Sequence, residues 1–309
     1  MKKHLVLILV MLFSFGLVIA QDEEAPKKKK DRPVRSMFES SILIDDQTSV
    51  IPVQNTLEMH IQHRFGVIKD NGVSDLFGIY APSANTRMGL NYSVLNNLML
   101  GYGITRINNS NGKMISDFQV KWNILQQTRK NTIPLNLTLY ANMAIDGRNK
   151  DLYQPDTANL DYQFANRLSY FTQVMVGRKF AEWFSLELHF SWTHYNAVSA
   201  VIPNVEGYEH DVMGVGGHMR FKFSPQSSIL IMYTAPIFIK GMAENEVVLN
   251  NWYSNFGIAY EVATSTHAFQ MFVTTASGII PQDIYMYNNS QWTKTEIRIG
   301  FNITRLWNF

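Results

Sequence analysis

The histidines of this chain offer its most specific chemistry. His189 and His218 fall at polar positions of two neighbouring stretches of alternating polarity, and His60 falls at such a position in an earlier stretch. A zinc site needs three or four ligands that converge, but only His189 and His218 lie on adjacent stretches. We therefore interpret this pair as hydrogen-bonded side chains of a polar face, and we expect no metal site and no cofactor.

A hydrolytic site would need a nucleophile, a base and a group that orients the base. Ser191 lies near His194, and the acids Glu206, Glu209 and Asp211 follow, but no motif or spacing joins these residues into such a site. The chain contains no cysteine, which excludes a cysteine nucleophile, zinc–thiolate sites and disulfides. We expect no enzymatic activity.

Charged side chains are spread over the polar positions of the alternating stretches. The candidates to line an interior are Glu58, Arg64, Arg87, Asp117, Lys121, Glu187, His189, His218, Arg220, Glu296 and Arg298. With Arg167, Lys222 and Glu261, the inward positions hold seven basic and five acidic residues. These charges could pair and fill the interior, or they could line a water-filled pore with a slight preference for anions.

The elements that would position these side chains are strands. Alternation of apolar and polar residues, which is typical of a strand with two unlike faces, recurs in twelve stretches at 57–65, 86–94, 98–104, 118–124, 135–143, 168–176, 184–192, 215–223, 229–235, 252–262, 269–275 and 297–303. A soluble β-sandwich would show the same alternation. The stretches run about nine to twelve residues, however, which is longer than most soluble strands and matches a tilted membrane-crossing strand.

Two further patterns favour the membrane. Long and short connections alternate along most of the chain, as in transmembrane barrels. Aromatic residues gather near the ends of the stretches, where they would form interfacial belts, at Tyr92, Tyr102, Trp183, Trp192, Trp252, Tyr260 and Trp307. We therefore predict an all-β fold over residues 55–309, a transmembrane antiparallel up-and-down β-barrel of about 12 strands.

The first 54 residues precede the alternating stretches. Lys2 and Lys3, an apolar run and the small-residue end Val18-Ile19-Ala20 predict a signal peptide at 1–20, cleaved after Ala20; the run is short for a spanning anchor. Residues 21–54 are predicted to form a periplasmic leader, in which Met37–Val53 is less polar and compatible with a short strand or a plug-like segment. Loss of Lys2 and Lys3 brings the 27 basic residues level with the 25 acidic ones, which gives no reason to expect nucleic acid.

The last stretch ends on an aromatic residue. Phe309, Trp307, Ile303 and Phe301 share one parity, and Arg305 interrupts them. This pattern resembles the recognition strand by which the outer-membrane assembly machinery takes up barrel proteins. The resemblance implies that the assembly machinery and outer-membrane lipid are partners of the chain.

Several segments resemble an uncharacterised family of bacterial outer-membrane β-barrel proteins. The matching segments are 41–44 with 47–48, 61–66, 76–78, 87–92 and 117–122, and the His63-Arg64-Phe65-Gly66 sequence is the most specific of them. They are spread over residues 41–122 of the chain. The resemblance implies a barrel in the bacterial outer membrane and brings no established activity, ligand or catalytic residue.

The polar, mixed-charge faces predict an integral outer-membrane barrel that acts as a small passive channel or transporter, with a small polar solute as a further candidate partner. One alternative is a closed structural or docking barrel that contacts a partner through its long outer loops, Asp146–Tyr162 and Ser277–Gln291. An outer-membrane hydrolase is the least favoured alternative.

Overall fold

The computed structural model describes residues 31–68, 74, 76, 78–80, 84–108, 112–149, 162–197, 210–237 and 253–309. The predicted signal peptide, its cleavage site and most of the loop Asp146–Tyr162 lie outside these residues. Residues 33–309 form one compact unit. Within the described part of the chain, no helix is long and apolar enough to cross a membrane.

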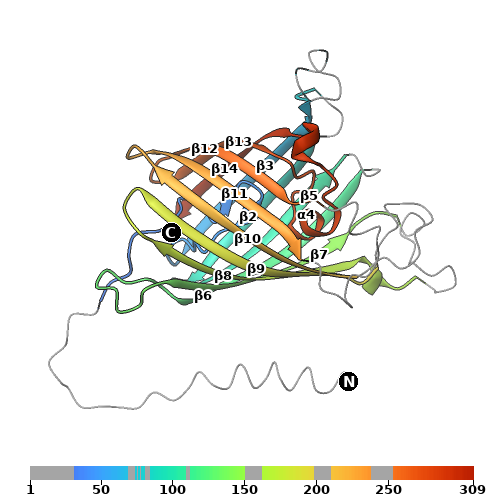
Figure 1. Cartoon of the computed structure of the whole chain (residues 1–309). Coiled ribbons are helices and arrows are strands. Elements are labelled where there is room, and N and C mark those ends of the chain that lie inside the picture. Colours follow the sequence, from blue (N-terminus) through green and yellow to red (C-terminus); the bar gives the residue numbers. More distant parts are fainter. Residues whose placement is uncertain are drawn as a thin grey trace. The chain divides into compact units, whose positions relative to one another are not determined.

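Twelve antiparallel strands close into a barrel (Figure 1). They are β3 (Thr56–Val67), β4 (Asn85–Leu95), β5 (Leu98–Ile107), β6 (Lys113–Leu125), β7 (Asn136–Asp146), β8 (Leu168–Lys179), β9 (Phe184–Tyr195), β10 (Asp211–Lys222), β11 (Ser227–Ile237), β12 (Asn255–Ala263), β13 (His267–Thr274) and β14 (Arg298–Asn308). Each strand pairs with its neighbour in the sequence, and β14 closes the barrel on β3, with Asn308 opposite Thr56. The predicted twelve-strand up-and-down barrel is confirmed.

The pattern of β6 shows why these sequences form the wall. Phe118, Val120 and Trp122 are exposed on the outer face, whereas Asp117 and Lys121 on the inner face are completely buried. The other strands repeat the apolar outer face, and the inner face is mostly polar, with apolar residues such as Leu230 and Phe272 on β11 to β13. Such an outer face is disfavoured in water and matches the lipid-facing band of a membrane barrel.

A hairpin from the N-terminal segment fills the lumen. It comprises β1 (Ile42–Leu43) and β2 (Asp46–Gln47), which pair antiparallel. Residues 37–49 are buried almost throughout, and we call residues 37–50 the plug segment. The predicted leader of residues 21–54 therefore includes a part that packs inside the barrel, and the division at residue 54 separates segments that the structure joins.

The backbone at the tip of the hairpin adopts an unusual conformation. Ile44 has a φ of 55°, a left-handed value that is uncommon for a β-branched residue. The wall holds both of its backbone groups, since its N–H donates to Gln270 Oε1 at 3.0 Å and its carbonyl accepts from Arg64 at 2.7 Å and from Asn302 at 2.8 Å. Contacts with the wall therefore determine the shape of the plug segment.

The connection between β13 and β14 also folds into the lumen. It carries α4 (Pro281–Tyr287), in which Pro281 to Met286 are buried and which packs on β8, β9 and β10. At Gly214 of β10 a Cβ atom would lie 2.3 Å from the ring of Tyr285, so glycine leaves room for the helix. The prediction that Ser277–Gln291 is an outer docking loop is wrong. The segment lies inside the barrel, where apolar side chains such as Ile280 and Met286 are buried.

Candidate functional site: the polar lumen and its plug

The strongest contact between the plug segment and the wall is at the hairpin tip. Arg64 of β3 donates from Nε to Asp45 Oδ1 at 2.6 Å, and both side chains are fully buried. Asp45 also accepts hydrogen bonds from Asn255 and Thr274. A buried charge is tolerated only when it is paired and hydrogen-bonded, and Arg64 and Asp45 meet that condition only when the plug segment is in place.

A second set of contacts holds the middle of the plug segment. Ser41 Oγ donates to Glu58 Oε2 at 2.6 Å, and the Ser41 carbonyl accepts from Lys121 Nζ at 2.9 Å. His60 Nε2 lies 3.2 Å from Ser41 Oγ. Near the start of the segment, Arg220 Nη2 pairs with Glu39 Oε1 at 2.6 Å. The wall charges therefore meet plug atoms at several levels of the barrel.

The plug segment also makes apolar contacts. Met37, Phe38, Leu43 and Ile44 pack with Leu230, Met232, Ala259 and Phe272 of the wall. One side of the lumen is therefore apolar where the plug segment lies against β11, β12 and β13. Polar contacts on the other sides fix the position of the plug segment.

The ion pair of Arg87 and Asp117 joins two strands of the wall without the plug segment. Arg87 donates to both carboxylate oxygens of Asp117, at 2.7 and 3.0 Å, and to Gln62 at 3.2 Å. Asn142 donates to the same carboxylate. This network crosses β3, β4, β6 and β7 and stiffens the wall next to the plug segment.

A cluster of histidines and acids lies where the plug segment, the wall and α4 meet. Asp46 Oδ2 lies 3.1 Å from His189 Nε2 and 3.5 Å from His218 Nε2, and Tyr285 Oη lies 3.1 Å from His189 Nε2. His218 Nδ1 lies 3.3 Å from Glu187 Oε1. We call Asp46, His189, His218, Glu187 and Tyr285 the central cluster. All five side chains are buried.

Electrostatics at the central cluster keep Asp46 charged and Tyr285 neutral. Burial would raise the pKa of Asp46, but His189 and His218 outweigh it and hold this pKa well below its usual range. Burial raises the pKa of Tyr285 well above its usual value. Tyr285 is therefore a hydrogen-bond donor to the cluster at neutral pH.

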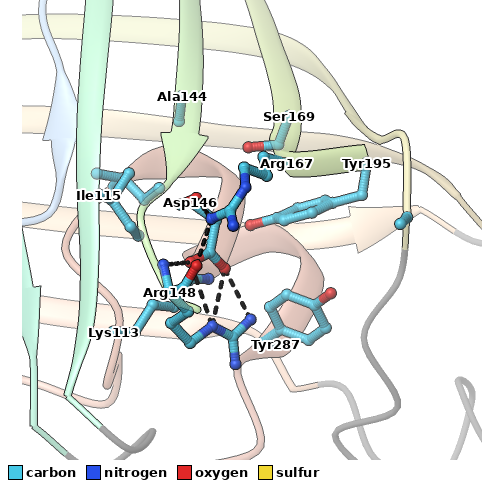
Figure 2. Close-up of a pocket in the computed structure, with 11 residues that line it drawn as sticks. Lys113, Ile115, Ala144, Asp146, Arg148, Arg167, Ser169, Tyr195 and Tyr287 are labelled. Carbon is cyan, nitrogen blue, oxygen red and sulfur yellow. Dashed lines mark hydrogen bonds and ion pairs between the residues drawn. The ribbon is translucent and has the colours of Figure 1, made fainter. Parts of the chain in front are cut away.

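The end of the barrel that carries the connection from β13 to β14, which we call the loop rim, holds polar contacts between α4 and the wall. Asp283 accepts from Lys113 Nζ at 3.0 Å and from Tyr195 Oη at 2.7 Å. Figure 2 shows a small pocket beside these contacts, where Asp146, Arg148 and Arg167 point toward one another. Its volume is about 10 Å³, which is room for one water molecule. A second cavity of about 10 Å³ lies deeper, beside Asp45 and Arg87.

The other end, which we call the turn rim, holds a larger cavity. It has a volume of about 430 Å³ and lies between the plug segment and the turns of the wall; its lining includes Arg35, Val50, Asn96 and Gln127. The chain enters the barrel here, where the Val34 N–H donates to the Gln127 carbonyl at 2.9 Å. The described residues therefore form a vestibule at the turn rim that ends at the plug segment.

The sequence-based candidates fall into two groups. Nine are buried on the inner face: Glu58, Arg64, Arg87, Asp117, Lys121, Glu187, His189, His218 and Arg220. Glu296 and Arg298 are half-buried at the loop rim, where Glu296 accepts from the Gln291 N–H and Arg298 donates to Ser290. Neither of these two contacts the plug segment through a described hydrogen bond.

The residues of the hydrolase hypothesis are not brought together. Ser191 is buried on the inner face of β9, whereas His194 lies on the outer face and pairs with Asp211 at 2.9 Å. Glu206 and Glu209 lie outside the described residues. The strand places the nucleophile and the base on opposite sides of the wall.

Sequence reasoning missed Glu39, Ser41, Asp45, Asp46 and Tyr285. These residues lie outside the alternating stretches, so their parity could not assign them to the lumen. One signal was present: the inner faces hold more basic than acidic positions. Glu39 and Asp45 supply part of the missing negative charge, since they pair with Arg220 and Arg64.

The sequence was compared with models of known protein families. The family described as "Membrane bound beta barrel domain (DUF5777)" matches residues 38–307. The chain belongs to this family. The match to the membrane-bound β-barrel domain begins within the plug segment, so the plug segment is part of the domain. A comparison with curated protein sequences gives no match.

Solved structures resemble the barrel at low identity. The KdgM porin is 5% identical with a TM-score of 0.46, and the match covers 82% of this chain and 99% of that chain. The COG4313 outer membrane channel from Pseudomonas putida F1 is 13% identical with a TM-score of 0.47, over 84% and 97%. The TodX monoaromatic hydrocarbon channel is 8% identical with a TM-score of 0.38, over 84% and 92%. At these identities the likeness concerns the fold alone.

Proposed function

We propose that the protein is a passive channel for small polar solutes in the bacterial outer membrane, closed in the described conformation by its plug segment. The observation that carries the proposal is that charged residues of the inner wall also hold the plug segment. Arg64, Glu58 and Lys121 line the inner wall, and their contacts include atoms of a segment that is not part of the wall. If the plug segment leaves, these groups face a polar path.

The size of the barrel is compatible with this function. Eight strands enclose an interior that side chains fill, and sixteen enclose an aqueous channel. Twelve strands lie between these cases. The plug segment and α4 occupy the space that wall side chains leave, so displacement of the plug segment would extend the vestibule at the turn rim into the barrel.

Location and assembly are part of the proposal. The signal peptide cleaved after Ala20 would export the chain, and Phe301, Ile303, Trp307 and Phe309 would present the assembly signal to the outer-membrane machinery. Thr56 and Asn308 pair at the turn rim, which would then face the periplasm. The outer face of the barrel would contact lipid.

A planar-bilayer recording tests the proposal. A variant that lacks residues 37–50 should show a stable stepwise conductance, whereas the full chain should be closed for most of the recording. Retained heat-dependent mobility on an SDS gel is the control for a folded barrel. A folded deletion variant that conducts no ions would contradict the proposal.

One observation favours a second candidate, a closed structural barrel. The plug segment and α4 are almost completely buried, and the two inner cavities have volumes of only about 10 Å³ each. A barrel of this kind would support the envelope or dock a partner through the loop Asp146–Tyr162, whose described residues are few. It predicts that the intact protein never conducts, whatever the deletion variant does.

A further inference from the structure

We propose that Asp46, His189 and His218 bind one divalent transition-metal ion of the zinc class, which joins the plug segment to the barrel wall. One potential ligand atom of each residue lies within 4.8 Å of those of the other two. The atoms that face one another most closely are Asp46 Oδ2, His189 Nε2 and His218 Nε2. All three residues are buried. The site would exist whether or not the barrel conducts.

The separations fit a tetrahedral ion. Zinc binds imidazole nitrogen and carboxylate oxygen at about 2.0–2.2 Å, so its ligand atoms are roughly 3.3 Å apart. Asp46 Oδ2 lies 3.1 Å from His189 Nε2 and 3.5 Å from His218 Nε2. The two rings are tilted with centroids 4.8 Å apart. The two imidazole nitrogens would have to approach to about the same separation, roughly 3.3 Å, when the ion binds.

The orientation of His218 is the strongest argument. Glu187 is a carboxylate, so His218 Nδ1 must donate to it, at 3.3 Å. Nε2 of the same ring points toward Asp46 Oδ2 at 3.5 Å and has no nearer polar partner among the described residues. A metal ion between Nε2 and Oδ2 would bind both atoms, in place of the proton that joins them in the metal-free cluster. Ligand histidines are typically held in this way by a carboxylate behind them.

Hydrogen bonds hold the Asp46 carboxylate in place, and Gln173 Nε2 lies within reach of both of its oxygens, 3.2 Å from Oδ2. Asp46 Oδ1 accepts from the Gln47 N–H at 2.7 Å and from Gln173 Nε2 at 3.1 Å. These bonds orient the carboxylate so that Oδ2 faces the two imidazoles. The Ser49 N–H donates to Glu187 at 3.1 Å, which fixes the carboxylate behind His218 as well.

The fourth ligand of the ion would lie on the side of Tyr285. Its hydroxyl lies 3.1 Å from His189 Nε2 and 3.5 Å from Asp46 Oδ2. From this position the hydroxyl would contact Asp46 or a water molecule on the ion. Three protein ligands with one further position are a usual arrangement for zinc.

The donor set selects the class of ion. Calcium and magnesium take oxygen ligands almost exclusively, whereas two imidazoles and one carboxylate suit zinc and neighbouring transition metals. Metal-free, the same cluster would be an ion-paired network in which a protonated His218 bridges Asp46 and Glu187. Measured zinc binding distinguishes these two states.

The test uses the full-length protein, extracted from membranes in detergent, stripped with EDTA and titrated with ZnCl2. We expect one Zn2+ per chain and a higher midpoint of thermal unfolding with zinc. His189→Gln and His218→Gln should each weaken binding more than 100-fold. Glu187→Gln should weaken it about 10–100-fold with the stoichiometry unchanged, as expected for a residue that orients a ligand.

Two controls separate this site from other imidazoles. His60→Gln removes a buried histidine that also contacts the plug segment and should leave zinc binding unchanged. His194→Gln removes one imidazole of the partly exposed His194–Asp211 pair at the loop rim, and it should also leave zinc binding unchanged. Absence of zinc binding by the intact chain, or binding that follows His194 instead of His189 and His218, would overturn the proposal.

A spectroscopic measurement covers the case in which the histidine variants fail to fold. Co2+ added to the intact protein should give the intense visible absorption of a tetrahedral site, and Zn2+ should displace it. Weak octahedral bands with no displacement would overturn the proposal without any variant.

Discussion

At the scale of the residue, Arg64 of the wall donates two of its hydrogen bonds to the plug segment. It donates to Asp45 Oδ1 and to the Ile44 carbonyl, and Asn302 of the wall accepts its third bond at 3.0 Å. The guanidinium also lies 4.5 Å from the ring centre of Phe272. Removal of one partner from such a buried pair is costly because the remaining charge has no water to replace it.

Asp45→Ala tests this contact. We expect the loss of about 3–5 kcal/mol from the docking of the plug segment, because Arg64 is left charged and buried. Hydrogen–deuterium exchange should rise in residues 37–50 while the strands of the wall stay protected. Glu182→Ala breaks an exposed pair with Lys179 and is the control, with no measurable change expected. Equal exchange in both variants would contradict the assigned role of Asp45.

The sequence could place Arg64 in the lumen but could not name its partner. Parity along β3 sorts inner from outer residues because each wall side chain faces either lipid or lumen. Asp45 and Asp46 follow no such rule, since the plug segment touches the wall on several sides. For the same reason the sequence predicts His189 and His218 as a pair without a third partner. The carboxylate beside them, Asp46, comes from a segment without periodicity.

At the scale of the element, α4 packs against the wall at Gly214, where the absence of a side chain leaves room for the ring of Tyr285. Gly214→Ala would place a Cβ atom 2.3 Å from the ring of Tyr285. We expect an overpacking cost of about 1–3 kcal/mol and faster hydrogen exchange in Pro281–Tyr287. Val215→Ala, on the outer face next to it, is the matched control. If α4 exchanges equally in the two variants, the helix does not rest on Gly214.

The strand β6 tests the environment of the outer face. Val120 lies near the middle of the strand and Leu125 at its end, and both are exposed. In a bilayer, Val120→Arg should cost about 2–4 kcal/mol and Leu125→Arg about 0–1 kcal/mol. Urea-dependent unfolding in lipid vesicles would measure both values. Similar costs for the two variants would contradict a membrane-spanning wall.

At the scale of the whole molecule, the barrel and its contents follow different rules. The twelve strands were predictable because strand length, alternation and closure all arise from one constraint, the pairing of every backbone group within lipid. The filling of the lumen was not predictable in the same way. Ser277–Gln291 reads as an outer loop by its length, and only the fit of Tyr285 over Gly214 and of Asp283 beside Lys113 turns it inward.

The central claim is that the plug segment closes a polar conducting path in the intact protein, and a reversible crosslink tests it most directly. Ser40 Oγ lies 2.8 Å from Thr304 Oγ1, and the chain has no other cysteine to interfere with a Ser40→Cys, Thr304→Cys pair. We predict that openings in planar-bilayer recordings disappear when this disulfide forms and return after reduction, while the single Ser40→Cys variant conducts in both conditions. Openings that persist in the oxidised, fully crosslinked protein, or a protein that never opens when reduced, would contradict the account.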